Sequence, residues 1–130
     1  PNNTSTSIQE LVRNALRSNP DWLVVAEARG KEMNDALNSV MTGHPIITTL
    51  HAKSLEAIPK RIARMIMSAD TTQKHEDIME DVNEHLKVYV FLNRRFKRNG
   101  EVVRYIESIG EIDDEGKMKT IYRKAKNEED

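Results

Sequence analysis

Two short apolar segments of the chain each end in a side chain that could act on a nucleotide phosphate. Residues 22–26 are followed by Glu27, and residues 46–50 are followed by His51. A glutamate can accept a proton from an attacking water or hold a Mg2+-bound water, and a histidine can donate a hydrogen bond to a γ-phosphate oxygen. In open parallel sheets, ligands bind outside the carboxyl ends of the strands. The pattern therefore predicts Glu27 and His51 as catalytic residues at one end of a parallel sheet.

Neither residue is specific when taken alone. A glutamate after a strand also fits a solvated or capping role, and a single histidine also fits ordinary packing. The sequence contains no Gly-x-x-x-x-Gly-Lys-Ser/Thr phosphate loop. Because the backbone N–H groups and the lysine of such a loop hold the phosphates, the affinity of this chain for ATP should be very low. We therefore expect half of a hydrolytic nucleotide site, and no specific ATP turnover by this chain alone.

A zinc site is the alternative use of these side chains. His44, His51 and Glu27 are residue types that bind zinc. However, His44 precedes the second strand and His51 follows it, so about seven extended residues at about 3.3 Å each separate them by roughly 20 Å. Ligand atoms about 2 Å from one metal cannot be that far apart. We expect no direct metal ligand, with Mg2+ held only through water at Glu27, and we expect His44 to support a helix end or reach a neighbouring subunit.

Composition and charge narrow the classes of protein that fit. The 130 residues suffice for one domain with a core. The formal net charge of −1 argues against a general nucleic-acid binder, which needs a basic surplus. The absence of cysteine excludes a disulfide framework and a thiolate nucleophile. No apolar run approaches the roughly 18 residues that cross a bilayer, so we expect no direct membrane insertion. The start at Pro1, without an initiator Met, suggests an excised fragment.

Apolar spacing and chain breakers predict a βαβ unit, then two helices, then a β-hairpin. The two strands of the βαβ unit are continuous apolar runs, which is typical of parallel strands buried on both faces. Their unpaired edge leads us to expect self-association or segment exchange. Helices are expected at about 6–18, between Gly30 and Gly43, and at 55–68 and 73–86; strands are expected at 22–26, 46–50, 88–92, 102–106 and 118–122.

Three positions carry sharper local predictions. Gly43 is placed to end the second helix in the left-handed conformation. That helix should bury one stripe, made of Met33, Ala36, Leu37, Val40 and Met41. Pro59 falls inside the third predicted helix and implies either a kink or a later start. Asn99-Gly100 favours a two-residue type I′ turn in the hairpin.

An ordered set of residues also resembles a known family. The set comprises Leu11-Val12-Arg13-Asn14-Ala15-Leu16-Arg17, Pro20-Asp21, Val24-Val25-Ala26-Glu27-Ala28-Arg29-Gly30, Glu32, Thr42-Gly43-His44, Thr48-Thr49-Leu50-His51-Ala52 and Arg61. It resembles the type II/type IV secretion and pilus-assembly ATPases, with the tight-adherence (CpaF-like) branch nearest. The likeness is strong over about 5–67 and looser over 81–111. The chain departs from the family pattern in three places: Ser18-Asn19 replaces a basic-apolar pair, Ala26 replaces a glycine, and Pro59 replaces an aliphatic residue.

The resemblance implies a fold and a division of the chain. The fold class is α/β, a partial RecA-like P-loop NTPase core without its P-loop portion, followed by helices and a C-terminal antiparallel β-hairpin. Residues 1–70 would form the Walker B and histidine-box part of the core. Residues 71–123 would form a helix and β-hairpin subdomain of the same domain, and residues 124–130 a charged tail.

The resemblance also implies roles for single residues. Glu27 matches the Walker B glutamate, and His51 the histidine nearest the γ-phosphate. The resemblance implies that four residues couple the nucleotide site to the sheet or to the adjacent subunit: Arg29, Glu32, Thr49 and Arg61. It implies that Thr42, Gly43 and His44 form the structural part of the family's histidine box. A surface salt bridge is the alternative for each arginine, and a favourable interaction with the helix dipole is the alternative for Glu32.

The function implied is ATP hydrolysis with Mg2+ in a hexameric ring that powers pilus assembly or protein secretion. The implied partners are further copies of the chain and the cytoplasmic side of an inner-membrane platform protein, with no nucleic acid, and the implied location is the cytoplasm. This chain alone is expected to be inactive because it lacks the phosphate loop. The alternative is a naturally truncated, non-catalytic module that binds or caps such an ATPase.

Overall fold

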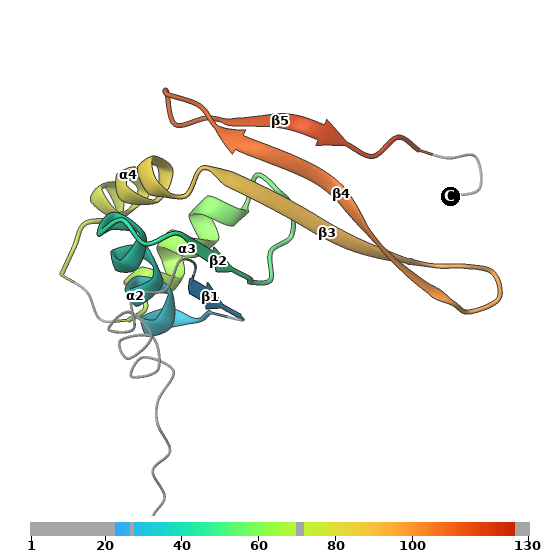
Figure 1. Ribbon diagram of the computed structural model, residues 1–130, viewed down its shortest axis with the longest axis horizontal. Coiled ribbons are helices and arrows are strands. Elements are labelled where there is room, and N and C mark those ends of the chain that lie inside the picture. The colour runs from blue at the N-terminus through green and yellow to red at the C-terminus, as the bar shows by residue number, and fades with distance from the viewer. Residues whose placement is uncertain (1–22, 27, 70–71, 127–130) are drawn as a thin grey trace, which may run out of the picture.

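The computed structural model describes residues 23–26, 28–69 and 72–126. A small parallel sheet and three helices form its body, and a long antiparallel sheet extends away from them (Figure 1). The helix predicted at 6–18 and the Pro20-Asp21 segment lie outside the described residues. The mixed α/β architecture, with parallel strands, helices and C-terminal antiparallel strands, confirms the predicted fold class.

The predicted βαβ unit is present. Strand β1 (Leu23–Val25) pairs in parallel with β2 (Ile46–Thr48), and helix α2 (Gly30–Met41) connects them. Both strands are shorter than predicted, but two backbone hydrogen bonds continue the pairing beyond them. The N–H of Thr49 donates to the Val25 carbonyl oxygen over 3.3 Å, and the N–H of Ala28 donates to the Thr49 carbonyl oxygen over 3.2 Å. The carboxyl ends of the two strands are thereby held together.

The prediction that both faces of these strands are buried is wrong. Val25 is buried, whereas Val24 is 63% exposed and its neighbour across the pair, Ile47, is 52% exposed. Successive side chains of a strand point to opposite faces, and the helices of the described part cover only one of them. An apolar run indicates a strand, but whether a second layer covers it depends on what packs there.

Helix α2 ends as predicted. Gly43 has φ 93°, a left-handed value that glycine adopts without a Cβ clash, and its N–H donates to the Val40 carbonyl oxygen over 2.9 Å. Met33, Ala36 and Leu37 of the predicted stripe are buried. Met41 is exposed, because it occupies the last turn, beyond the neighbouring helices.

Pro59 marks a later helix start rather than a kink. Helix α3 (Ile58–Met67) begins one residue before Pro59. The first turn of a helix needs no backbone N–H donors, so proline is tolerated there. Leu55 lies in the turn before the helix and is buried together with Ile62.

Helix α4 (His75–His85) packs against α3 and buries Ile78 and Val82. Core residues from α2, α3 and α4 form one cluster with Tyr89 and Ile112 of the antiparallel sheet. Among the described residues, no helix combines the length and apolar character that crossing a membrane requires.

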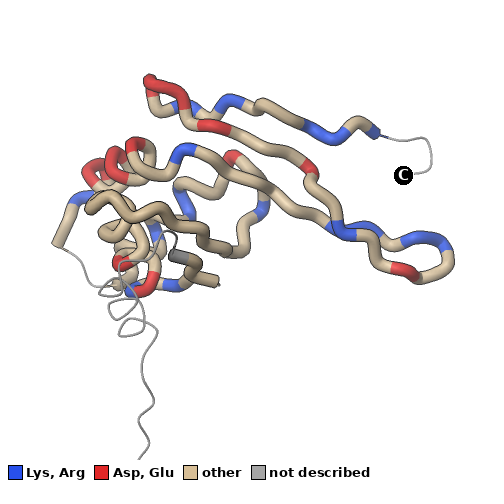
Figure 2. The backbone as a smooth tube through the Cα atoms, viewed as in Figure 1, with Lys and Arg blue, Asp and Glu red and all other residues tan. Residues whose placement is uncertain are grey.

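The antiparallel sheet has the order β3-β4-β5, formed by β3 (Val88–Phe96), β4 (Val102–Ile112) and β5 (Met118–Arg123). The tip of the β3–β4 hairpin lies far from the helices and carries several Lys and Arg residues (Figure 2). Its turn is not the predicted type I′. Lys97 N–H donates to the Glu101 carbonyl oxygen and Gly100 N–H to the Lys97 carbonyl oxygen, so three residues form the loop, with Gly100 at φ 87°. Three-residue loops with glycine in the left-handed position are the next common hairpin class.

The sheet meets the body where β4 has no side chain. A Cβ placed on Gly110 would lie 2.8 Å from Leu55 Cδ2 and would also collide with the Met118 side chain. Glycine therefore permits the close approach of β4 to the turn before α3.

Ile66 tests how much the α3 face stabilises the fold. Its side chain is fully buried in the core cluster. We expect Ile66→Ala to lower the free energy of unfolding by about 2–5 kcal/mol, through lost burial and the cavity left behind. The adjacent Met67, which is 39% exposed, provides the control. Met67→Ala should change stability by less than about 1 kcal/mol, measured by urea denaturation, and equal losses would contradict the assigned packing of α3.

Candidate functional site

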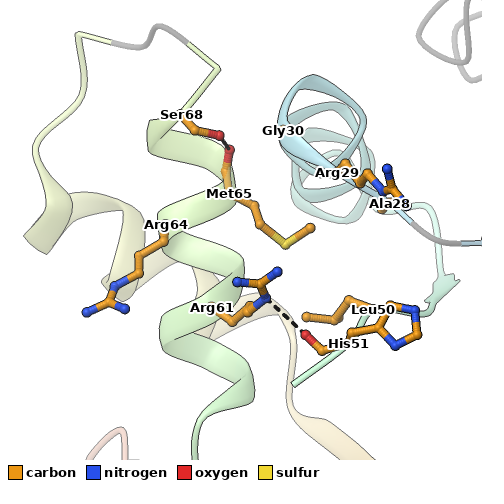
Figure 3. A pocket seen from close by; sticks show the side chains of 9 residues that line it. All are labelled: Ala28, Arg29, Gly30, Leu50, His51, Arg61, Arg64, Met65 and Ser68. Carbon is orange, nitrogen blue, oxygen red and sulfur yellow. Dashed lines mark hydrogen bonds between the residues drawn. The ribbon is translucent and has the colours of Figure 1, made fainter. Parts of the chain in front are cut away.

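A pocket of about 450 Å3 lies at the carboxyl ends of β1 and β2. The segment that follows β1 forms one wall, the end of the β2 segment forms another, and one face of α3 completes it (Figure 3). This is the place where open α/β sheets bind ligands. Its lining residues are Ala28, Arg29, Gly30, Leu50, His51, Arg61, Arg64, Met65 and Ser68.

A side-chain hydrogen bond ties the end of the β2 segment to α3. The Nε–H of Arg61 donates to the His51 backbone carbonyl oxygen over 2.9 Å. In Figure 3 the Arg61 guanidinium points toward His51, while the Arg64 side chain, one turn further along α3, points away from it. Arg61 therefore fixes the backbone at His51, and the rest of its planar guanidinium keeps further N–H donors.

The pocket is cationic in its described part. Arg29, Arg61 and Arg64 line it from two elements, and no carboxylate occurs among the described lining residues. Guanidinium groups match the oxygens of phosphates in charge and geometry. The donor set suits a phosphate, and histidine adds a further hydrogen-bonding group. It does not suit Mg2+, which prefers oxygen ligands, so any Mg2+ ligand must come from outside these residues.

The predicted site residues are only partly brought together. Arg29, His51 and Arg61 line the same pocket, and their predicted roles toward a nucleotide stay predictions. Glu27 lies outside the described residues, so its side chain has no position here. Thr49 contributes backbone pairing to β1 and lines a second cavity instead of this pocket. Glu32 occupies the first turn of α2, outside the pocket lining.

The Thr42-Gly43-His44 segment lies at the other end of β2. The Thr42 hydroxyl donates to the Ser39 carbonyl oxygen over 2.9 Å and lies 3.3 Å from His44 Nδ1. The His44 N–H donates to the Ser39 carbonyl oxygen over 3.0 Å. These contacts close the end of α2. His44 and His51 thus flank β2 at opposite ends, in agreement with the separation expected from strand length.

Sequence reasoning assigned no site role to six of the nine pocket residues, three of which lie along α3. Arg64, Met65 and Ser68 follow Arg61 at helical spacings of three, four and seven along α3. That spacing puts them on one helix face. The spacing from Arg61 could therefore have identified these residues. It indicates a site, however, only when α3 is known to border the strand ends.

Residues 2–97 match the family described as type II/IV secretion system protein. Since this match covers more than half of the chain, the chain belongs to the type II/IV secretion system protein family. Among relatives, an uncharacterised protein of Bacillus anthracis is 33% identical over 132 residues, covering 96% of this chain and 30% of that protein. The type IV secretion system protein VirB11 of Brucella suis is 36% identical over 66 residues, covering 50% of this chain and 18% of that protein.

A solved structure has the same fold. The Legionella pneumophila ATPase DotB superposes with a TM-score of 0.70 at 25% sequence identity, covering 85% of this chain and 29% of DotB. The chain therefore spans 30% of the length of the Bacillus anthracis protein and 29% of the length of DotB.

Proposed function

We propose that this chain supplies the hydrolytic end of a nucleotide site in a secretion-motor ATPase. The observation that carries the proposal is the cationic pocket at the carboxyl ends of β1 and β2, which Arg29, His51 and Arg61 line. The description of DotB as an ATPase and membership of the secretion family support ATP as the ligand. The reaction proposed is hydrolysis of ATP with Mg2+ by the full-length protein.

In this proposal each residue has a separate task. His51 donates a hydrogen bond to a terminal phosphate oxygen, and Arg61 holds His51 in place through its backbone carbonyl. Arg29 and Arg61 stabilise the negative charge that develops on the transferred phosphoryl group. Glu27 orients the attacking water and accepts its proton. A bound Mg2+ would neutralise charge on the phosphates. Thr49, Glu32 and the Thr42-Gly43-His44 turn act as supports or as contacts to another subunit.

The assembly proposed is a hexameric ring on the cytoplasmic side of an inner-membrane platform protein, powering pilus assembly or secretion. The tight-adherence (CpaF-like) branch fits best, on the residues quoted for the resemblance. The division of the chain into a 1–70 core part, a 71–123 subdomain and a 124–130 tail belongs to the same proposal.

The 130-residue chain should show no specific ATP turnover. It lacks a phosphate loop, so the triphosphate has no backbone cradle or P-loop lysine. The measurement is Mg2+-dependent phosphate release by the purified chain at high protein concentration, with the Glu27→Gln variant as the control for contaminating ATPases. Turnover by the chain that disappears in Glu27→Gln would contradict this expectation.

The missing phosphate loop also favours a second candidate, a non-catalytic module that binds or caps an ATPase of this family. The reading frame separates the two. An upstream phosphate loop in the same frame supports the ATPase, and a start codon close to Pro1 supports the module.

A further inference from the structure

The β3–β4 hairpin carries an exposed face that combines apolar and basic side chains. Residues directly opposite each other in an antiparallel pair project their side chains to the same face, as do alternate residues of one strand. The register places six such residues together, which we call the tip face: Leu92, Arg94, Phe96, Val102, Arg104 and Ile106. All six are exposed, and Leu92 and Phe96 are exposed by 65% and 66%. A contiguous exposed apolar patch indicates an interaction surface.

The arginines of the tip face have no anionic partner in the described part of the chain. Arg94 and Arg104 lie directly opposite each other, and like charges in that position destabilise a sheet. The Arg94 guanidinium lies 5.8 Å from the centre of the Phe96 ring. Neither arginine forms an ion pair with a described carboxylate, whereas Lys97 at the turn pairs with Glu101 over 3.4 Å. A carboxylate from outside would reduce the repulsion between the two arginines.

Helix α4 has the opposite charge. Its exposed carboxylates include Glu76, Glu80 and Glu84, which follow one another at a spacing of four residues and so form one stripe along the helix. Like charges at that spacing destabilise a helix. None of the three pairs with a Lys or Arg of the described part, and Glu84 has only His85, whose Nε2 lies 4.0 Å from its carboxylate. Met79, three residues after Glu76, adds a half-buried apolar side chain beside the stripe.

The two surfaces are complementary and lie far apart in one chain. Residues 92–106 contain five Lys or Arg and one Glu, whereas residues 75–85 contain five Asp or Glu and no Lys or Arg. Helix α4 belongs to the helical body, and the hairpin tip extends away from that body (Figure 2), so the tip cannot reach α4 of its own chain. Two complementary surfaces at separate places on one molecule give a head-to-tail contact, which closes into a ring when the rotation between copies permits.

We propose that the tip face binds α4 of a second copy of this chain. Arg94 and Arg104 pair with carboxylates of the α4 stripe, and Phe96 packs against Met79. Arginine, phenylalanine and methionine are enriched in the centres of protein interfaces. The contact names the surfaces that join neighbouring copies, and it rests on the proposed function only in taking a further copy as the partner. It does not depend on ATP hydrolysis.

Charge reversal in the full-length protein tests this contact. Arg94→Glu combined with Arg104→Glu should weaken self-association by about 10–100-fold, because close charge pairs at interfaces contribute at least that much to affinity. Glu80→Lys combined with Glu84→Lys should weaken it by a similar factor. All four substitutions in one chain make the two surfaces complementary again, and should return the affinity to within about tenfold of that of the parent protein. Sedimentation over a range of protein concentrations measures each affinity.

Lys117→Glu combined with Lys119→Glu is the matched control. Both lysines are exposed at the start of β5, outside the tip face, and their reversal changes the net charge by the same amount as the two arginine substitutions. Self-association should change by less than about threefold, as expected for screened surface charges. An equal loss in this variant would mean that net charge alone governs association, and would contradict the contact.

Crosslinking locates the contact directly. These 130 residues contain no cysteine, so Arg98→Cys at the hairpin turn and Glu80→Cys on α4 can be introduced into a full-length protein with its other cysteines replaced. With a short bismaleimide, the protein that carries both should give a ladder of linked chains, because each copy offers one hairpin and one α4. Each single variant should remain unlinked.

Four results would overturn the proposal. One is a fourfold variant that associates as weakly as the two double variants. Another is a ring of unchanged mass in which the two-cysteine protein gives no ladder, which rejects this contact but not the proposed ring. A protein that is monomeric at all concentrations rejects both. The fourth is binding to phosphatidylserine vesicles that disappears in the double arginine variant while self-association persists, which would identify an anionic membrane surface as the occupant.

Discussion

Glu27→Gln in the full-length protein should reduce kcat for ATP hydrolysis by about 10²–10⁴-fold. The amide keeps the size of the side chain but cannot accept a proton from the attacking water, and general-base catalysis contributes about that factor. Binding of ATP should change little, because the phosphates are held by other groups. Steady-state phosphate release gives kcat, and a fluorescent nucleotide gives the affinity.

Glu32→Gln is the matched control for that variant. Glu32 lies five residues further on, in the first turn of α2, and does not line the pocket. Its neutralisation removes a favourable interaction with the helix dipole, worth about 0.3–1 kcal/mol of stability. Because Glu32 acts in this proposal only as a support or a subunit contact outside the pocket, kcat should fall by less than about tenfold. A Glu27→Gln enzyme with normal kcat would remove Glu27 from the mechanism.

Arg61→Ala in the full-length protein should reduce kcat by about 10²–10³-fold, the usual loss when a donor to developing charge is removed. The variant loses a positive charge at the pocket and also the 2.9 Å hydrogen bond that holds the His51 carbonyl oxygen. Freed from α3, the His51 backbone no longer positions the imidazole. Single-turnover measurements at saturating ATP isolate this effect on the chemical step.

Arg64→Ala distinguishes the effect of losing a positive charge at the pocket from the effect of losing the hydrogen bond to His51. Arg64 lines the same pocket from the next turn of α3, and its side chain points away from His51 in Figure 3. It carries the same charge as Arg61 but does not share the Arg61 hydrogen bond to the His51 carbonyl oxygen. We expect a loss below about 10-fold, as for a screened surface charge. Equal losses in the two variants would mean that only the total positive charge of the pocket matters.

Local signals in the sequence were read correctly where one short-range force dominates. Gly43 ends α2 because a left-handed residue is needed there, and Pro59 lies in the first turn of α3 because only there is its missing N–H harmless. The predicted type of the hairpin turn was wrong, because no single local force decides it. Asn99-Gly100 is compatible with two loop lengths, and the register of β3 against β4 selects the longer one.

Residue types and spacing alone determined the parallel β1–β2 pair, its connecting helix, and the placing of His51 at the carboxyl end of that pair. These follow from apolar periodicity and from the rule that parallel strands share their carboxyl ends, both of which operate within about thirty residues. Tertiary structure alone decided which helix closes the pocket. Only packing of α3 against the strand ends brings Arg61 to His51 and adds Arg64, Met65 and Ser68 to the lining. It also decided that Val24 and Ile47 on one face of β1 and β2 stay exposed in the described part of the chain. Burial depends on contacts between distant segments, which a local apolar pattern does not specify.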